Sequence, residues 1–243
     1  MLKLYHCPET RSMRALWLLH EIRAPFHLIE MPFELAATRS PGYLAVHPLG
    51  RVPCLVDEGF TLFESGAIAE YLCERFPESG LGRLTGHSER YEWLQWIHYS
   101  ETIAVHAAAL VQQFHFIAPE ERSSAVLRLE GRRLHKAIEV VDSRLEGREY
   151  LLRSGFSAAD ISVGYSVHLA HRFIAIARYP RIEAYYERLR GRPAFRASLP
   201  KDWVRPLQWL VGDFAPATDA GQRNVAPHPP DLLRTDAQRD PKL

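Results

Sequence analysis

Residues 48–72 of the chain read PLGRVPCLVDEGFTLFESGAIAEYL, and this segment contains the signals that decide the fold around it. Two short runs, residues 54–57 and 60–63, have the composition of strands and are separated by an acidic-Gly pair that favours a two-residue hairpin turn. We therefore predict an antiparallel hairpin. The apolar periodicity of residues 67–72 predicts a helix directly after the second strand.

The ends of this hairpin carry groups suited to a peptide-like ligand. Because Pro53 cannot donate to a strand ladder, we expect the main chain of Val52 to stay unpaired and free to bind an extended ligand. Ser65 has the position of a helix cap, where a helix start attracts a carboxylate. Glu64, next to it, attracts an ammonium group. The junction thus offers both ends of an amino-acid zwitterion a partner; purely structural roles for these residues are the alternative.

The composition limits the class of partner. The 243 residues suffice for one or two domains with a substantial core. The 30 basic residues nearly cancel the 29 acidic ones, so no strong field favours nucleic acid or a membrane surface. No apolar run approaches the roughly 18 to 20 residues that span a bilayer, and the start, MLKLYH, has a strand pattern without a signal-peptide core. We expect a cytoplasmic protein that binds small molecules and another protein chain.

The cysteines and histidines argue against a metal site. Cys7, Cys54 and Cys73 are an odd number without C-x-x-C spacing, so neither a disulfide framework nor a zinc site is expected. The twelve histidines are scattered along the chain. We therefore predict no bound metal.

The N-terminal third has the pattern of a small mixed sheet with helices against it. In order, we predict a strand at residues 2–5, a helix at 12–23, a strand at 26–30, and an irregular connection at 31–47 with a helical turn near Tyr43. With the hairpin and the helix after it, this order gives a four-stranded mixed sheet in a domain at residues 1–76. Residues 77–86, PESGLGRLTG, are predicted to be an interdomain linker.

After the linker the strand signals end. Residues 87–116 and 119–146 predict two long helices, and two more are expected up to Phe173 and at residues 181–190. Ser157 and Asp160 have capping-box spacing at the start of the third of these helices. We predict an all-helical domain at residues 87–213. The polar composition of residues 214–243 predicts a disordered tail.

These patterns together resemble the cytosolic glutathione S-transferase family over about residues 1–205. Three motifs carry the resemblance, and they occur in the same order as in the family. They are PLGRVP at residues 48–53, ES at residues 64–65 followed by AIAEYL at residues 67–72, and SAADI at residues 157–161. The fold class it implies is α/β plus all-α, with an N-terminal thioredoxin-like domain (β-α-β-β-β-α) followed by an all-helical C-terminal domain. The pattern is most similar to bacterial members of theta-like and nu-like classes.

The resemblance implies a binding site for glutathione as co-substrate. Pro53 corresponds to the family's cis-proline, and Val52 pairs its main chain with the cysteinyl part of glutathione. Glu64 and Ser65 hold the γ-glutamyl end, in agreement with the zwitterion site inferred from the residues themselves. Arg51 reaches the glycyl carboxylate.

The family lowers the pKa of the glutathione thiol with a hydroxyl near the end of the first strand, or uses a cysteine to form a mixed disulfide. Counting back from Arg14, taken as the family's arginine in the first helix, Thr10 falls at the hydroxyl position. Ser12 is the second candidate, with a backbone N–H or Arg11 as alternatives. Lowering this pKa by two units needs about 2.7 kcal/mol, which a charge-assisted hydrogen bond at a helix start largely supplies. Cys7 lies too early for the family's cysteine, and we interpret it as a small buried thiol.

We therefore expect a homodimeric glutathione transferase that conjugates glutathione to a hydrophobic electrophile held against the helical domain. The residues expected to form the electrophile site are Tyr99, His106, Leu110 and Phe114. Glu101 resembles the acidic residue that reaches across the family's dimer to the γ-glutamyl amine, with an ordinary exposed helical glutamate as the alternative.

Two other functions remain open. One is glutathione-dependent disulfide reduction or peroxide removal, as in nu-like relatives. The other is a non-catalytic binding or scaffold protein with the same fold, an interpretation supported by Glu9, whose charge would oppose a nearby thiolate.

Overall fold

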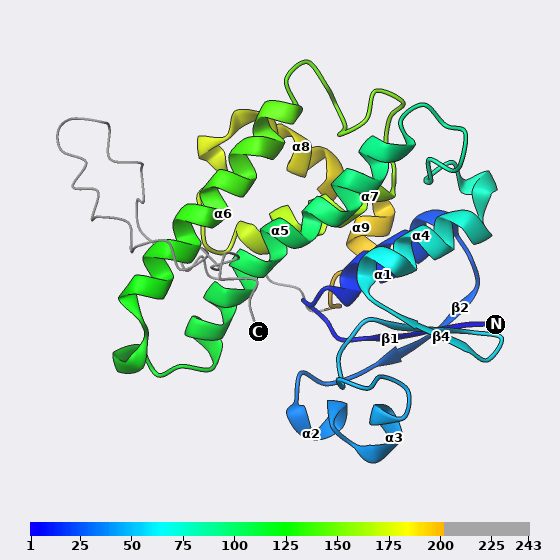
Figure 1. Ribbon diagram of the computed structural model, residues 1–243, viewed down its shortest axis with the longest axis horizontal. Helices are drawn as coiled ribbons and strands as arrows, with labels where there is room; N and C mark the ends of the chain where they lie inside the picture. Colours follow the sequence, from blue (N-terminus) through cyan, green and yellow to red (C-terminus); the bar gives the residue numbers. More distant parts are fainter. Residues whose placement is uncertain (202–243) are drawn as a thin grey trace, which may run out of the picture.

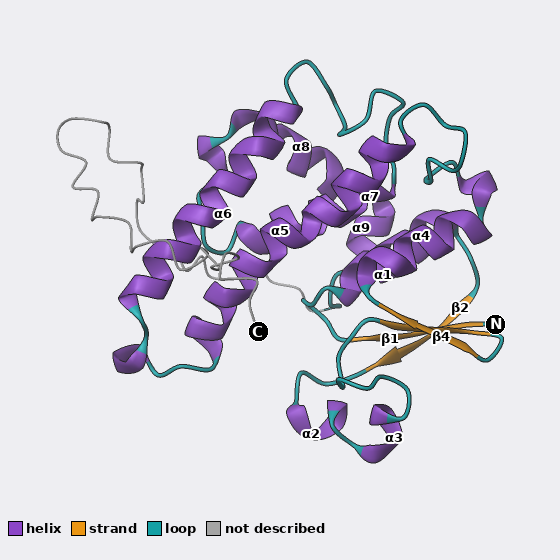
Figure 2. Cartoon of the chain, viewed as in Figure 1, coloured by secondary structure: helices purple, strands orange, loops and turns teal. Residues whose placement is uncertain are grey.

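The computed structural model describes residues 1–201 of the chain (Figure 1). The predicted end of the helical domain at residue 213 and the predicted tail at residues 214–243 lie outside the described residues. Within the described range, a sheet with flanking helices occupies the N-terminal third, and the remainder is helical (Figure 2).

The sheet contains four strands in the order β2-β1-β3-β4. The elements of this part are β1 (Leu2–His6), α1 (Ser12–Ile22), β2 (Phe26–Glu30), α2 (Leu35–Thr38), α3 (Pro41–Leu44), β3 (Cys54–Asp57), β4 (Phe60–Phe63) and α4 (Ser65–Arg75). Strand β1 pairs parallel with β2 and antiparallel with β3, and β3 pairs antiparallel with β4. The predicted mixed sheet and hairpin are confirmed, whereas α2 was not expected.

Hydrophobic alternation places the sheet against two helices. Leu2 and Leu4 of β1 are buried while Lys3 between them is exposed, so one face of the strand meets the core. Helices α1 and α4 cover the face of the sheet toward the helical part, and α2 and α3 lie on its other side (Figure 1). The loops at the ends of these strands therefore lie where the two parts of the molecule meet.

The helical part is built around one enclosed helix. Its helices are α5 (Arg90–His115), α6 (Ser124–Arg144), α7 (Ala158–Ala170), α8 (Pro180–Arg190) and α9 (Pro193–Ala197), with short 3-10 turns η1 (Pro77–Ser79), η2 (Pro119–Glu121) and η3 (Ile176–Arg178). Every residue of α7 is buried. At Gly164 a Cβ atom would approach Cδ1 of Leu189 to 2.5 Å, so the glycine allows the close approach of α8. Helix α7 ends three residues before the predicted Phe173, and α9 was not predicted.

The start of α7 has the predicted capping box. The Ser157 hydroxyl accepts from the Ala159 N–H at 3.3 Å, and Oδ2 of Asp160 accepts from the Ser157 N–H at 2.9 Å. The Ala158 N–H donates to the carbonyl oxygen of Leu81 at 3.0 Å, which ties the segment after η1 to this helix. Within residues 1–201, no helix combines the length and the apolar character needed to cross a membrane.

Candidate active site

A cleft of about 300 Å³ lies between the loops of the sheet part and the C-terminal end of α5. Its lining includes Thr10, Arg11, Phe33, Arg51, Val52 and Phe116. Thr10 and Arg11 come from the loop between β1 and α1, Phe33 from the segment after β2, and Phe116 from the residue after α5. Three predicted site residues, Thr10, Arg51 and Val52, are thus brought to one cleft.

The two predicted hydroxyls occupy different surroundings. The Thr10 hydroxyl donates to the carbonyl oxygen of Cys7 at 2.7 Å and lies 2.8 Å from Oγ of Ser12. Ser12 is fully buried, and its Oγ accepts from the Cys7 N–H at 3.1 Å and lies 2.8 Å from Nδ1 of His6. The Thr10 side chain therefore borders the cleft, while the Ser12 side chain lies behind it.

Burial keeps two ionisable groups beneath this loop neutral. Burial, with a smaller contribution from Glu30, raises the pKa of the Cys7 thiol to about 11. Burial lowers the pKa of His6 to about 4. Cys7 is therefore an un-ionised thiol at neutral pH, in agreement with its interpretation from the sequence. Within residues 1–201, no group of three or more His, Cys, Asp and Glu side chains has the arrangement of a metal site.

The opposite side of the cleft is formed by the segment that leads into β3. The Val52–Pro53 peptide bond is cis, and the ladders of β3 begin at Cys54, so the main chain of Val52 lies outside them. The Tyr43 hydroxyl donates to the carbonyl oxygen of Arg51 at 2.6 Å and fixes the segment. Gly50 has a φ of 55°, and a Cβ atom there would lie 2.2 Å from the carbonyl oxygen of Thr38. Only glycine fits this turn.

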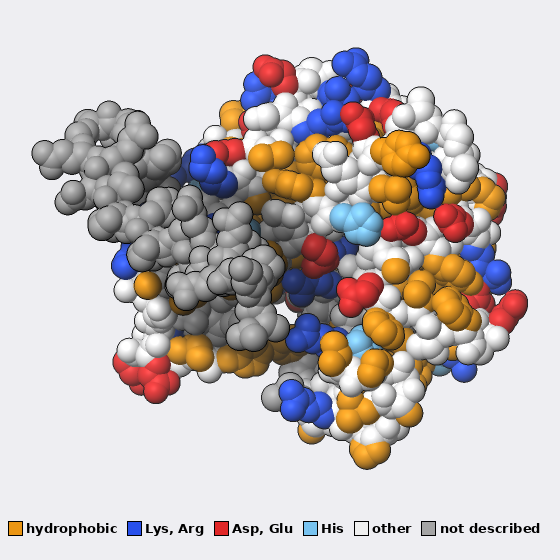
Figure 3. Space-filling view, in the orientation of Figure 1, with side chains coloured by type: hydrophobic (Ala, Val, Ile, Leu, Met, Phe, Trp, Pro, Cys, Tyr) orange, Lys and Arg blue, Asp and Glu red, His pale blue; other side chains and the backbone are white. Residues whose placement is uncertain are grey.

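A buried arginine joins the site to the helical part. The Arg14 guanidinium is 2% exposed and donates to Oγ of Ser65 at 2.9 Å and to Oγ of Ser166 at 2.7 Å. It also forms an ion pair with Glu101 of α5, which Arg11 contacts from the cleft with 3.0 Å between Nε and Oε2. In the space-filling view, acidic and basic side chains lie close together near the centre of the side of the molecule that is shown (Figure 3).

The charge of Glu101 is set by these two arginines. Burial raises its pKa, but Arg14 and Arg11 outweigh burial and lower it. The carboxylate is therefore ionised at neutral pH. Its side chain is 47% exposed and forms ion pairs with two arginines of its own chain, and its role toward glutathione stays a prediction.

Comparison with known proteins identifies the family. The family model described as "Glutathione S-transferase, N-terminal domain" matches residues 1–74. Glutathione S-transferase F13 of Arabidopsis thaliana is 30% identical over 203 residues, which cover 79% of this chain and 92% of the relative. The chain belongs to the glutathione S-transferase family.

Two further proteins are similar over comparable lengths. The disulfide-bond oxidoreductase YfcG of Escherichia coli (strain K12) is 30% identical over 213 residues, which cover 83% of this chain and 95% of the relative. The solved structure of a sphingomonad glutathione S-transferase complexed with glutathione is 28% identical, with a TM-score of 0.71 over 81% of this chain and 96% of that chain.

The role expected of Ser65 as a helix cap is wrong. Helix α4 begins at Ser65 itself, and the residue at the cap position is Glu64, whose side chain makes no capping hydrogen bond. A capping oxygen must come from the residue before the first helical one. Oγ of Ser65 instead accepts from the buried Arg14, a charged donor that competes effectively with backbone N–H groups.

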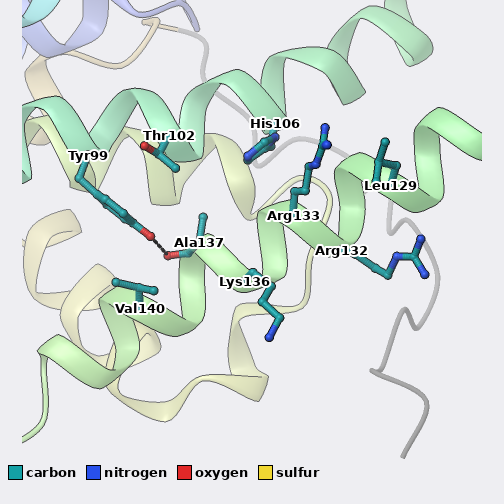
Figure 4. A pocket seen from close by; sticks show the side chains of 9 residues that line it. All are labelled: Tyr99, Thr102, His106, Leu129, Arg132, Arg133, Lys136, Ala137 and Val140. Atoms are coloured by element: carbon teal, nitrogen blue, oxygen red, sulfur yellow. Dashed lines mark hydrogen bonds between the residues drawn. The ribbon is translucent and has the colours of Figure 1, made fainter. Parts of the chain in front are cut away.

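The residues expected to hold the electrophile do not line the cleft. Leu110 is fully buried in the core, and Phe114 packs against the core partly buried. Tyr99 and His106 line a separate groove of about 440 Å³ between α5 and α6 (Figure 4). There the Tyr99 hydroxyl donates to the carbonyl oxygen of Ala137 at 3.0 Å. Helical periodicity groups residues into faces but does not tell which face meets the cleft, so these four residues stay a prediction that the lining of this cleft does not support.

The face of α5 that meets the cleft carries Gln112 and is continued by Phe116. The rings of Phe116 and Phe33 are stacked, with centroids 6.1 Å apart and planes 28° from parallel. Phe116 is 61% exposed and Phe33 is 63% exposed. These two residues were missed, although an aromatic residue within the otherwise irregular connection of residues 31–47 was a usable signal.

Proposed function

We propose that this glutathione S-transferase binds glutathione in the cleft, lowers the pKa of its thiol and conjugates the thiolate to a hydrophobic electrophile. The observation that carries the proposal is that one cleft is lined both by Thr10 and by Val52. The former is the candidate for activating the sulfur, and the latter is the candidate for holding the cysteinyl main chain. In the reaction the sulfur forms a bond to the electrophilic carbon, the leaving group departs with its electron pair, and the thiol proton passes to solvent.

Thr10 is proposed to donate its hydroxyl hydrogen bond to the thiolate. In the free protein this hydroxyl donates to the carbonyl oxygen of Cys7, which also accepts from Ser12 Oγ at 3.0 Å. Ser12 can therefore satisfy that carbonyl when Thr10 turns to the sulfur, so we assign Ser12 a supporting role. The positive end of α1 and the guanidinium of Arg11 beside it add to the stabilisation of the anion.

The two ends of glutathione are assigned to further predicted site residues. Arg51, which lines the cleft, is proposed to bind the glycyl carboxylate. Glu64 and Ser65 are proposed to hold the γ-glutamyl end, and Glu101 to contact its amine in the dimer. Arg14 supports this assignment because it connects Ser65 with Glu101 in one hydrogen-bonded group.

The electrophile is proposed to bind against Phe33 and Phe116. Both are exposed and apolar, and both border the cleft next to Thr10. An aromatic electrophile gains about 0.5–1.5 kcal/mol from ring stacking beyond the burial of its surface. The stacked pair therefore favours planar aromatic compounds.

We also propose a cytoplasmic homodimer. Exposed apolar side chains on both parts of the chain, including Leu49, Phe60 and Val140, support a second copy as the partner. Sedimentation should give twice the mass of the chain, and a monomer at micromolar concentration would contradict this proposal.

The decisive experiment is an ultraviolet titration of the thiolate of glutathione bound to the wild-type protein, Thr10→Ala and Ser12→Ala. We expect a lowered pKa in the wild type, return toward the free value in Thr10→Ala, and a smaller effect in Ser12→Ala. Bound glutathione with an unshifted pKa would instead favour the scaffold function.

Calorimetry on Glu64→Ala tests the binding half of the proposal. Loss of a charged partner should weaken glutathione binding at least about tenfold. The matched control is Glu78→Ala, an exposed glutamate in η1. Equal affinities in the two variants would contradict the zwitterion site.

Glutathione-dependent disulfide reduction is the second candidate function. The similarity to YfcG supports it. This chemistry requires no reactive protein thiol, and the three cysteines of the chain are all buried. Higher activity on a glutathionylated disulfide than on an aromatic electrophile would establish this alternative.

A further inference from the structure

The loop between β1 and α1 is held to the helical part at two points, one on each side of Thr10. Glu9 forms an ion pair with Arg172, which lies in the turn after α7. Arg11 forms the ion pair with Glu101 of α5. The residue proposed to activate the thiol therefore lies between an acidic and a basic neighbour, each of which forms an ion pair with a residue of the helical part.

The contacts of Glu9 come from one helix and the turn that follows it. Its Oε2 contacts Arg172 and lies 3.5 Å from Nε2 of His168. Its carbonyl oxygen accepts from the Tyr165 hydroxyl at 3.5 Å. Both side-chain partners are enclosed, since Arg172 is 12% exposed and His168 is 3% exposed. An ion pair removed from water to this degree is little screened by salt and costly to break from one side.

The backbone of Glu9 gives these contacts a second role. Its φ is 60°, in the left-handed region that residues other than glycine rarely adopt. A non-glycine residue keeps such a strained conformation only when its surroundings hold it there. Because Thr10 follows directly, the direction of the Thr10 side chain depends on this conformation.

The negative charge on Glu9 is balanced through one carboxylate oxygen, Oε2, while its buried Oε1 has no hydrogen-bond partner among residues 1–201. Burial raises its pKa, but His168 and Arg172 outweigh burial and lower it, so the carboxylate is ionised at neutral pH. The ring of His168 is oriented by a hydrogen bond between its other nitrogen, Nδ1, and the Tyr186 hydroxyl, 2.6 Å apart. The negative charge that appeared to oppose a thiolate is therefore paired with cationic Arg172.

We propose that Glu9 is a positioning residue whose ion pair with Arg172 holds the loop so that the Thr10 hydroxyl faces the thiol in the cleft. This inference rests on the proposed function of Thr10. Displacement of a catalytic group by about 1 Å is enough to lower a rate about 100-fold. Loss of the pair therefore acts on thiol activation rather than on the binding of glutathione, because neither Glu9 nor Arg172 is among the residues proposed to bind it.

The test is a double-mutant cycle with Glu9→Gln, Arg172→Gln and the double variant, assayed for kcat, KM for glutathione and the pKa of bound thiol. Each single variant should raise that pKa by about one unit and lower kcat about tenfold. KM for glutathione should change less than about threefold. The double variant should be no worse than Glu9→Gln alone, because the two side chains act as one unit.

Two further variants separate positioning from general instability. Glu187→Gln, which removes an exposed ion pair with Arg190 in α8, is the matched control and should change none of the three quantities. If Glu9→Gln does not fold, Glu9→Gly replaces it, because glycine adopts the left-handed conformation without the anchor.

The outcomes distinguish the positioning role of Glu9 from the proposed function of the cleft. If the bound thiol has a lowered pKa in the wild type that Thr10→Ala abolishes, while both single variants match the wild type, the positioning role is refuted and the proposed function stands. A rise in KM with unchanged kcat and pKa also refutes the positioning role. If the wild-type pKa is not lowered, the proposed function fails and the inference fails with it.

Discussion

Replacement of Arg14 by methionine should lower the free energy of unfolding more than removal of an exposed ion pair does. The reason is that Arg14 connects the sheet part to the helices. Methionine fills a similar volume but cannot donate a hydrogen bond. The substitution removes the hydrogen bonds to Ser65 and Ser166 and the ion pair with Glu101. These partners lie on α4, α7 and α5, so one side chain of α1 connects three helices.

The magnitude follows from the burial of each partner. Removing one member of a buried ion pair costs about 3–5 kcal/mol, mainly because the remaining charge is left unpaired. Glu101 is 47% exposed and regains water, so we expect the lower end of that range, about 3 kcal/mol. The hydroxyl of Ser166 also keeps its own hydrogen bond to the carbonyl oxygen of Ser100 at 2.9 Å, which limits the loss further.

The assay is urea unfolding without glutathione, so that loss of ligand binding does not enter the free energy. The matched control is Arg190→Met, which removes an ion pair in α8 whose partner Glu187 is 58% exposed and whose contribution is about 0–1 kcal/mol. If Arg14→Met lowers the free energy of unfolding no more than Arg190→Met does, the hydrogen-bonded group around Arg14 does not hold the two parts together.

Three further predictions concern stability, pH and the electrophile. Asp160→Ala leaves two buried backbone N–H groups without an acceptor and should lower the free energy of unfolding in urea by about 3 kcal/mol. Ser157→Ala should lower it by about 1 kcal/mol. Equal losses in the two variants would contradict the capping-box geometry. The pKa of His6 is about 4 in the folded protein and 6.5 when unperturbed, so the contribution of neutral His6 to the free energy of unfolding is complete above pH 6.5 and is lost as pH falls toward 4, about 3 kcal/mol in all. Unfolding of His6→Asn should therefore be less sensitive to acid than that of the wild type. An equal dependence on pH would contradict this prediction. Phe116→Ala should raise KM for a planar aromatic electrophile about fivefold without changing KM for glutathione. The control Tyr91→Ala, which removes an aromatic side chain that is 83% exposed, should change neither constant. A rise in both constants for Phe116→Ala would argue against an electrophile site.

The parts of the fold that the sequence predicts are those specified by neighbours along the chain. The hairpin follows from Glu58-Gly59, whose φ values of 49° and 87° are the left-handed pair that a type I′ turn needs. The start of α7 follows from a serine and an aspartate three residues apart. The short α2 carries no such signal, and α9 carries only the proline at its first position, Pro193. Helices of four and five residues are not stable by themselves and form where the tertiary structure supports them.

The candidate site was predictable to the extent that backbone chemistry determines it. Proline at position 53 and glycine at position 50 mark a segment of unusual conformation, and that segment forms one side of the cleft. Side-chain partners distant in sequence were not predictable. Ser65 matches the pattern of a cap, and only the fold brings Arg14, 51 residues away, to its hydroxyl. Glu9 likewise reads as an unpaired charge until Arg172, 163 residues away, is placed against it.

The two parts of the chain contribute to the site in different ways. The sheet part carries most of the groups proposed to contact glutathione, and α5 contributes Glu101 near its middle and Phe116 just after its end. Fifteen residues separate them, which is about 22 Å along a helix. Effects of substitutions this far apart are usually additive when no partner is shared. A substitution at Phe116 is therefore expected to leave the pairing of Arg11 with Glu101 unchanged, so the electrophile surface can vary without loosening this contact of the loop that carries Thr10.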